Sequence, residues 1–159
     1  MQIMIGVMAD THGSAYGIER AVLAAGDVDI WFHLGDVLSD AKALESRTGK
    51  PVYRVRGNCD FSDIYPSENT VEIGGVRILF THGHTLGVKY GIDSLFYRAE
   101  ELNCDIALFG HTHAPTIEAS GKLLAVNPGS PSNPRSGYAP SIAILRIENG
   151  EVYPSICPV

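Results

Sequence analysis

MQIMIGVMADTHG, residues 1–13, joins an apolar run to a polar corner. The first nine residues carry no charge, and the run stops at Asp10. They are too few to span a bilayer and lack the basic leader of a signal peptide, so we expect neither feature here. The pattern is typical of a buried strand over residues 2–9 that delivers polar side chains to the edge of a sheet.

The next forty residues alternate helix and strand signals. Helical spacing of apolar residues predicts a helix over residues 15–25, which Gly26 is placed to end. The runs DIWFHL and VYRV predict strands at 29–34 and 52–55, with a shorter helix over 40–48 between them. This β-α-β-α-β order favours a parallel sheet.

The second half has a different pattern. TVEI and VRILFT read as a hairpin around Gly74-Gly75, and apolar residues from Ile92 to Leu102 mark one face of a helix. A buried strand follows at 106–109. Four more strands are expected, at residues 116–120, 122–126, 141–148 and 151–156. The sequence therefore predicts an α/β fold in which two packed mixed sheets are flanked by helices.

Composition limits the function classes. The 159 residues suit one domain, and 12 basic against 18 acidic residues give a net charge of −6 without a basic cluster. Tight binding to a nucleic-acid polymer is therefore not expected, because neutralising phosphates takes a basic surface. Cys59, Cys104 and Cys157 form no C-x-x-C pair, which argues against a thiolate zinc site and favours a reducing cytoplasm.

Polar donors follow five of the predicted strands. The segments that carry them are ADTHG, HLGDV, RGNCD, LFTHGH and LFGHTH, and the donors are Asp10, His12, Asp36, Asn58, His82, His111 and His113. Each motif alone has an ordinary reading as a turn, since Gly, Asp and Asn are common turn residues. Together, at the carboxyl ends of strands where α/β proteins bind ligands, they predict a shared site. His33 lies inside an apolar run, so we expect it in the core instead.

These donor types suit a pair of divalent metal ions. Imidazole nitrogen with carboxylate or amide oxygen fits first-row ions, and seven donors are too many for one ion. Two ions about 3.5–4 Å apart that share a carboxylate can generate a bridging hydroxide and clamp a phosphoryl group. We expect manganese first, with nickel, iron, zinc or cobalt as alternatives.

The motifs DTHG, GD, GNCD, THGH and GHTH, in this order, resemble those of the calcineurin-like metallophosphoesterase superfamily. Their spacing, and NPGSPSNPR at 127–135, resemble its compact one-domain prokaryotic phosphodiesterase branch. The resemblance implies a four-layer α-β-β-α sandwich, a single metallophosphoesterase domain over residues 1–159. It also implies the ligand sets: Asp10, His12, Asp36 and His113 for one ion, and Asp36, Asn58, His82 and His111 for the other, with Asp36 as the bridge.

One position departs from the family pattern. The usual G-N-H-[DE] has a His that is thought to protonate the leaving group, whereas this chain has Cys59 there. A thiol is a poorer acid for this purpose than imidazolium, so we expect modest turnover and a preference for diesters with good leaving groups. Asn58, Cys59 and His84 form the candidate catalytic set, with Asp60 orienting Asn58. Arg135 resembles the family's arginine near the site and is the candidate substrate-binding residue.

Two function classes stay open. The first is a binuclear metal-dependent phosphodiesterase that acts on a small phosphodiester, more than on monoesters. The second is a non-catalytic interaction scaffold like the retromer subunit of the same fold, in which the metal site is degraded. Here all seven donors are present, which favours the enzyme. A protein phosphatase or nuclease is less favoured, and association into a homo-oligomer stays open.

Overall fold

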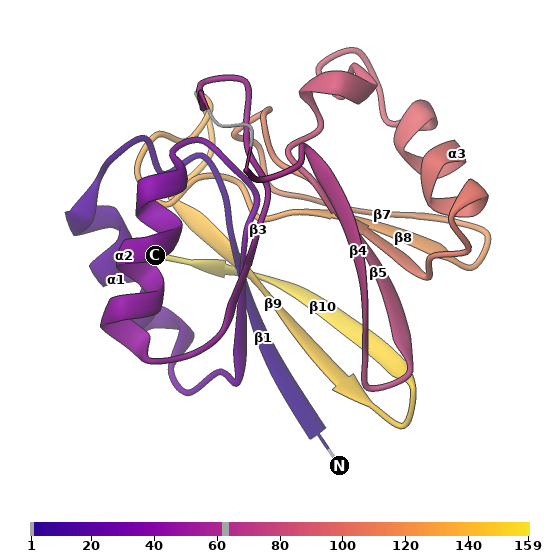
Figure 1. Ribbon diagram of the computed structural model, residues 1–159, viewed down its shortest axis with the longest axis horizontal. Helices are drawn as coiled ribbons and strands as arrows, with labels where there is room; N and C mark the ends of the chain where they lie inside the picture. Colours follow the sequence, from indigo (N-terminus) through magenta and orange to yellow (C-terminus); the bar gives the residue numbers. More distant parts are fainter. Residues whose placement is uncertain (1, 62–63) are drawn as a thin grey trace.

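A computed structural model describes residues 2–61 and 64–159 of the chain (Figure 1). In chain order its elements are β1 (Gln2–Met8), α1 (Ala15–Ala25), β2 (Ile30–His33), α2 (Leu38–Thr48), β3 (Val52–Arg54), β4 (Glu68–Ile73), β5 (Val76–Thr81), the 3-10 helix η1 (His84–Leu86), α3 (Asp93–Glu101), β6 (Ile106–Leu108), β7 (Thr116–Ser120), β8 (Leu123–Asn127), β9 (Ser141–Glu148) and β10 (Glu151–Pro158). Each predicted helix and strand is present, with ends that agree within two residues. None of the helices in these two ranges is long and apolar enough to cross a membrane.

The elements form four layers. One sheet has the strand order β10-β9-β1-β2-β3 and the other β4-β5-β6-β8-β7. Helices α1 and α2 lie on one side of the sheet pair and α3 on the other (Figure 1). Buried residues of both sheets, such as Val7, Phe32, Phe80 and Leu108, share one core between the layers. The prediction of two packed sheets flanked by helices, and the four-layer sandwich that the resemblance implies, are both confirmed.

Strand direction brings the predicted site segments to one end of the sandwich. Strands β1, β2 and β3 run parallel, and so do β5, β6 and β8 in the second sheet. The loops after β1, β2, β5 and β6 therefore begin at carboxyl ends of parallel strands. Backbone hydrogen bonds join neighbouring loops within each sheet: Asp10 N donates to Gly35 O, and Gly110 N donates to His82 O. His111 N donates to Asp10 Oδ2 and so joins loops of the two sheets.

Local sequence explains why the elements end where they do. The Ser14 hydroxyl accepts a hydrogen bond from Gly17 N and caps α1, while α2 ends at Gly49 in the left-handed conformation. Strand β10 contains Pro154 and Pro158, which lack a backbone N–H, and it lies at the edge of its sheet where this loss is tolerated.

Candidate metal centre

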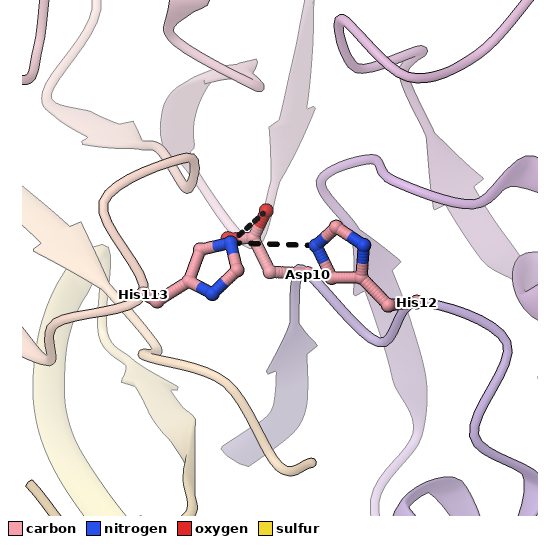
Figure 2. Close-up of side chains that lie close together, drawn as sticks. All are labelled: Asp10, His12 and His113. Carbon is pink, nitrogen blue, oxygen red and sulfur yellow. Dashed lines mark hydrogen bonds and ion pairs between the residues drawn. The ribbon is translucent and has the colours of Figure 1, made fainter. Parts of the chain in front are cut away.

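The first group of predicted donors lies where the loop after β1 meets the loop after β6. His113 Nε2 is 3.3 Å from His12 Nε2 and 3.4 Å from Asp10 Oδ1. Figure 2 shows the three side chains converging from opposite sides. Their donor atoms all lie within 4.8 Å of one another, a spacing that one metal ion can bridge.

The second group surrounds His82 at the end of β5. Its Nε2 is 3.1 Å from Asn58 Oδ1, 3.1 Å from His111 Nδ1 and 3.4 Å from Asp36 Oδ2. The same nitrogen is 3.8 Å from Asp10 Oδ1, so the two groups adjoin through Asp10. The structure thus brings together all seven donors that the sequence singled out.

Hydrogen bonds fix the tautomers of two histidines. His82 Nδ1 donates to Leu34 O and His113 Nδ1 donates to Asn133 O, each at 2.7 Å. Because a carbonyl only accepts, the proton of each neutral ring is on Nδ1, and Nε2 presents a lone pair to the site. Lone pairs that face carboxylate and amide oxygens at these distances call for a cation between them.

Asp10 supplies an independent test of whether a metal fits. Its carboxylate is fully buried, and while Oδ2 accepts a hydrogen bond from His111 N, Oδ1 has no hydrogen-bond partner among the residues that the structure describes. A buried carboxylate oxygen without a partner is costly. Oδ1 is also the atom that lies nearest to both histidine groups, so a divalent cation there would satisfy it, and the donor set fits first-row metals.

The backbone at the site is strained. Asp10, His12, His111 and His113 all have positive φ, between 47° and 72°, although none is glycine. Non-glycine residues rarely adopt this conformation, and such residues persist where the surrounding structure holds them for a function. Gly57 also allows the site to form, because a Cβ at this position would overlap Asp36 Oδ1.

The charge states of the site residues favour a bound cation. Burial, with smaller contributions from His82 and Lys89, lowers the pKa of His111 to about 4, so its ring is uncharged at neutral pH and one ring nitrogen has a free lone pair. Although burial alone would raise it, the pKa of Asp36 is held below its usual value by His82, by the Cys59 N–H and by His12. The neighbouring Asp10 carboxylate raises the pKa of His113.

A buried polar network that the sequence did not indicate supports the Asp10–His12 loop. Gly35 N donates to His33 Nδ1, His33 Nε2 donates to Thr11 Oγ1 at 3.0 Å, and Thr11 Oγ1 donates to Asp40 Oδ2 at 2.5 Å. Burial lowers the pKa of His33 to about 4, which keeps the ring neutral as this pattern requires. His33 is buried in the core, as the apolar run around it indicated. No sequence pattern singled out Thr11 or Asp40. Thr11 lies beside the candidate ligands Asp10 and His12, and Asp40 lies near the start of a helix.

We expect Thr11→Val to weaken metal binding about 10- to 100-fold, because it releases the loop that carries Asp10 and His12. The free energy of unfolding should also fall, by about 1–3 kcal/mol, since Asp40 and His33 lose a buried partner. Titration of the stripped protein with Mn²⁺ and thermal unfolding measure the two effects. Thr48→Val is the matched control, because it makes the same substitution at a hydroxyl that donates to Leu44 O at the end of α2. Wild-type affinity in Thr11→Val would contradict the positioning role.

The other predicted residues border the centre. Cys59 is exposed, and its backbone N–H donates to Asp36 Oδ1 at 3.0 Å. The His84 ring centroid lies 5.3 Å from that of His82, and its buried Nδ1 has no hydrogen-bond partner within residues 2–61 and 64–159. Asp60 accepts hydrogen bonds from Gly57 N and Leu38 N, and so fixes the backbone on either side of the Asn58 loop rather than the Asn58 side chain. Arg135 lines a cavity next to His111 and His113.

The matches to known proteins span the segments that carry these residues. Residues 3–150 match the model of the calcineurin-like phosphoesterase superfamily domain. The chain is 37% identical to the "Probable metallophosphoesterase YsnB" of Bacillus subtilis, over 90% of this chain and 83% of that protein. It is 31% identical to the phosphodiesterase YfcE of Escherichia coli, over 86% and 84% of the two chains.

Solved structures with a similar fold were also found. A predicted phosphoesterase from Streptococcus pneumoniae TIGR4 superposes with a TM-score of 0.80 and 32% identity, over 98% of this chain and 89% of that one. Vps29 of Entamoeba histolytica, solved with Zn²⁺, superposes with a TM-score of 0.78 over 97% and 98% of the chains, at 20% identity. The second likeness concerns the fold alone.

Proposed function

The chain belongs to the calcineurin-like phosphoesterase superfamily, and from this membership we propose that it is a binuclear metal-dependent phosphodiesterase of small phosphodiesters. The whole of residues 1–159 would form one such domain. Relatives named as phosphodiesterases, among them YfcE, support the reaction class.

The observation that carries the proposal is the set of facing lone pairs. His82 and His113 each donate the Nδ1 proton to a backbone carbonyl, and the Nε2 of each ring faces buried carboxylate oxygens. Lone pairs and carboxylates arranged in this way suit a bound cation. A purely structural cluster would gain nothing from placing them together.

Two ions would be held as the resemblance implies. Asp10, His12, Asp36 and His113 would bind one, and Asp36, Asn58, His82 and His111 the other, with manganese expected first. When bound, such ions polarise a phosphoryl group and supply a hydroxide nucleophile at neutral pH. Asp10 also lies between the two histidine groups, so it is the alternative to Asp36 as the ligand shared by both ions.

The chain's own side chains would handle the substrate. Asn58 presents its amide where the phosphoryl group binds, and Cys59 and His84 flank it as proton donors to the leaving oxygen. Burial and the neighbouring His82 lower the pKa of His84. Arg135 would contact a phosphate oxygen. The three cysteines are free, which fits the cytoplasm as the compartment.

We expect chelator-stripped protein to be inactive and Mn²⁺ to restore hydrolysis of bis(p-nitrophenyl) phosphate by at least about a hundred-fold, because the nucleophile is generated on the metal. The monoester p-nitrophenyl phosphate should react more slowly than the diester. The measurement is release of p-nitrophenolate with Mn²⁺, Ni²⁺, Co²⁺, Zn²⁺ and Mg²⁺ added back separately. Folded protein that stays inactive with every metal would overturn the proposal and favour the interaction scaffold.

A further inference from the structure

A cavity opens directly beside the metal centre. Its volume is about 360 Å³, within the range of small-molecule sites. Its lining consists of Lys89, His111, Thr112, His113, Asn133, Pro134 and Arg135. Two of these are metal-ligand candidates, so a group bound at the centre would extend into this space.

The charge of the lining is unlike that of the molecule. The chain carries −6 overall, yet the cavity lining holds two cationic side chains and no carboxylate. A concave site of one sign concentrates ligands of the opposite sign whatever the net charge. The cavity is therefore suited to an anion.

The two cations are also uncommitted. The Arg135 guanidinium has no partner among residues 2–61 and 64–159, whereas six other guanidinium groups each have one: those of Arg20, Arg47, Arg54, Arg77, Arg98 and Arg146. The Lys89 ammonium has no ion pair within the same part of the chain. Arg135 is held close to the centre, because its backbone N–H donates to His113 O at 3.0 Å. Free guanidinium and ammonium groups at one cavity are the usual means of binding phosphate.

We propose that Lys89 and Arg135 form an anion subsite that selects phosphodiesters carrying a second phosphoryl group. The inference rests on the proposed function: the scissile diester occupies the metal centre while the second phosphate occupies the cavity. The subsite thus defines the substrate class as a small bis-phosphorylated molecule, such as a nucleotide diester with an additional phosphate.

The test compares two chromogenic substrates that differ by one phosphate. Thymidine 5′-(p-nitrophenyl phosphate) and its 3′-phosphorylated form share the nucleoside and the leaving group. With Mn²⁺-loaded protein, kcat/KM should be at least about tenfold higher for the 3′-phosphorylated substrate, and added NaCl should reduce this ratio. Arg135→Gln and Lys89→Gln should each reduce the ratio about three- to tenfold. Lys122→Gln, on the turn between β7 and β8, removes an equal charge away from the cavity and should leave the ratio unchanged.

The outcomes separate this inference from the proposed function. Equal kcat/KM for the two substrates, or a ratio that survives in both cavity variants, overturns the subsite while leaving the phosphodiesterase intact. If neither substrate is hydrolysed, the proposed function fails, and calorimetric titration decides the subsite alone. Tighter binding of thymidine 3′,5′-bisphosphate than of the 5′-monophosphate, lost in Arg135→Gln, would support it; equal binding of the two would overturn it.

Discussion

We expect Asp36→Ala to release both metal ions and to lower kcat/KM for bis(p-nitrophenyl) phosphate by at least about a thousand-fold. Loss of a residue that only orients a metal ligand typically lowers metal affinity or activity about 10- to 100-fold. Loss of a carboxylate shared by two ions should lower both further. Asp36 is nearly fully buried, with Oδ1 accepting from Cys59 N and Oδ2 aimed at His82 Nε2. Metal content by elemental analysis and steady-state kinetics measure the two effects.

Asp10→Ala separates the two rival bridges. In the structure Asp10 Oδ1 faces both histidine groups, whereas the resemblance assigns the bridge to Asp36. If Asp36 is the shared ligand, Asp36→Ala should retain no ion and Asp10→Ala should retain one. The reverse pattern would transfer the bridging role to Asp10. Asp27→Ala removes an exposed carboxylate as the charge-matched control, and it should keep two ions and full activity.

The elements that position the site could be predicted because each has a strong local signal. The apolar runs before Asp10, Asp36, His82 and His111 are short and end abruptly, and the helix over 15–25 has both helical spacing and a terminal glycine. Alternating elements then required parallel strands, whose carboxyl ends meet. The convergence of the seven donors follows from this topology and not from any one motif.

Other features of the site had no such signal. Whether His82 and His113 carry their proton on Nδ1 depends on Leu34 O and Asn133 O, which are backbone atoms that tertiary folding brings close. The Thr11–His33–Asp40 network joins residues 22 and 29 positions apart, and none of the three belongs to a repeating pattern. The cavity at Lys89 and Arg135 is built from three loops whose shapes propensity does not determine. Local periodicity reports on elements, while these features arise only from contacts between them.

We expect Cys59→His to raise kcat/KM about 10- to 100-fold for a diester with an alkoxide leaving group and to change it little for a p-nitrophenolate leaving group. An alkoxide needs a proton as it departs, and a positioned general acid contributes about 10²–10⁴-fold to such steps. The thiol serves poorly, because partial burial, a hydrogen bond to Asp36 and the carboxylates of Asp36, Asp60 and Asp10 raise its pKa. An imidazolium beside the same carboxylates would stay protonated near neutral pH.

The measurement is the dependence of rate on the pKa of the leaving group over a series of aryl and alkyl diesters. In Cys59→His this dependence should be shallower than in the wild type, which is the signature of protonation in the transition state. Cys59→Ala tests whether the thiol itself takes part: unchanged rates would show that the native enzyme works without an acid at this position. Cys157→His is the matched control, since it places the same ring on β10, at the opposite edge of the sheet from β3, the strand that precedes Cys59. An equal slope in wild type and Cys59→His would assign the leaving-group proton elsewhere, with His84 the next residue to test, because its ring lies 6.2 Å from His111 at the same centre.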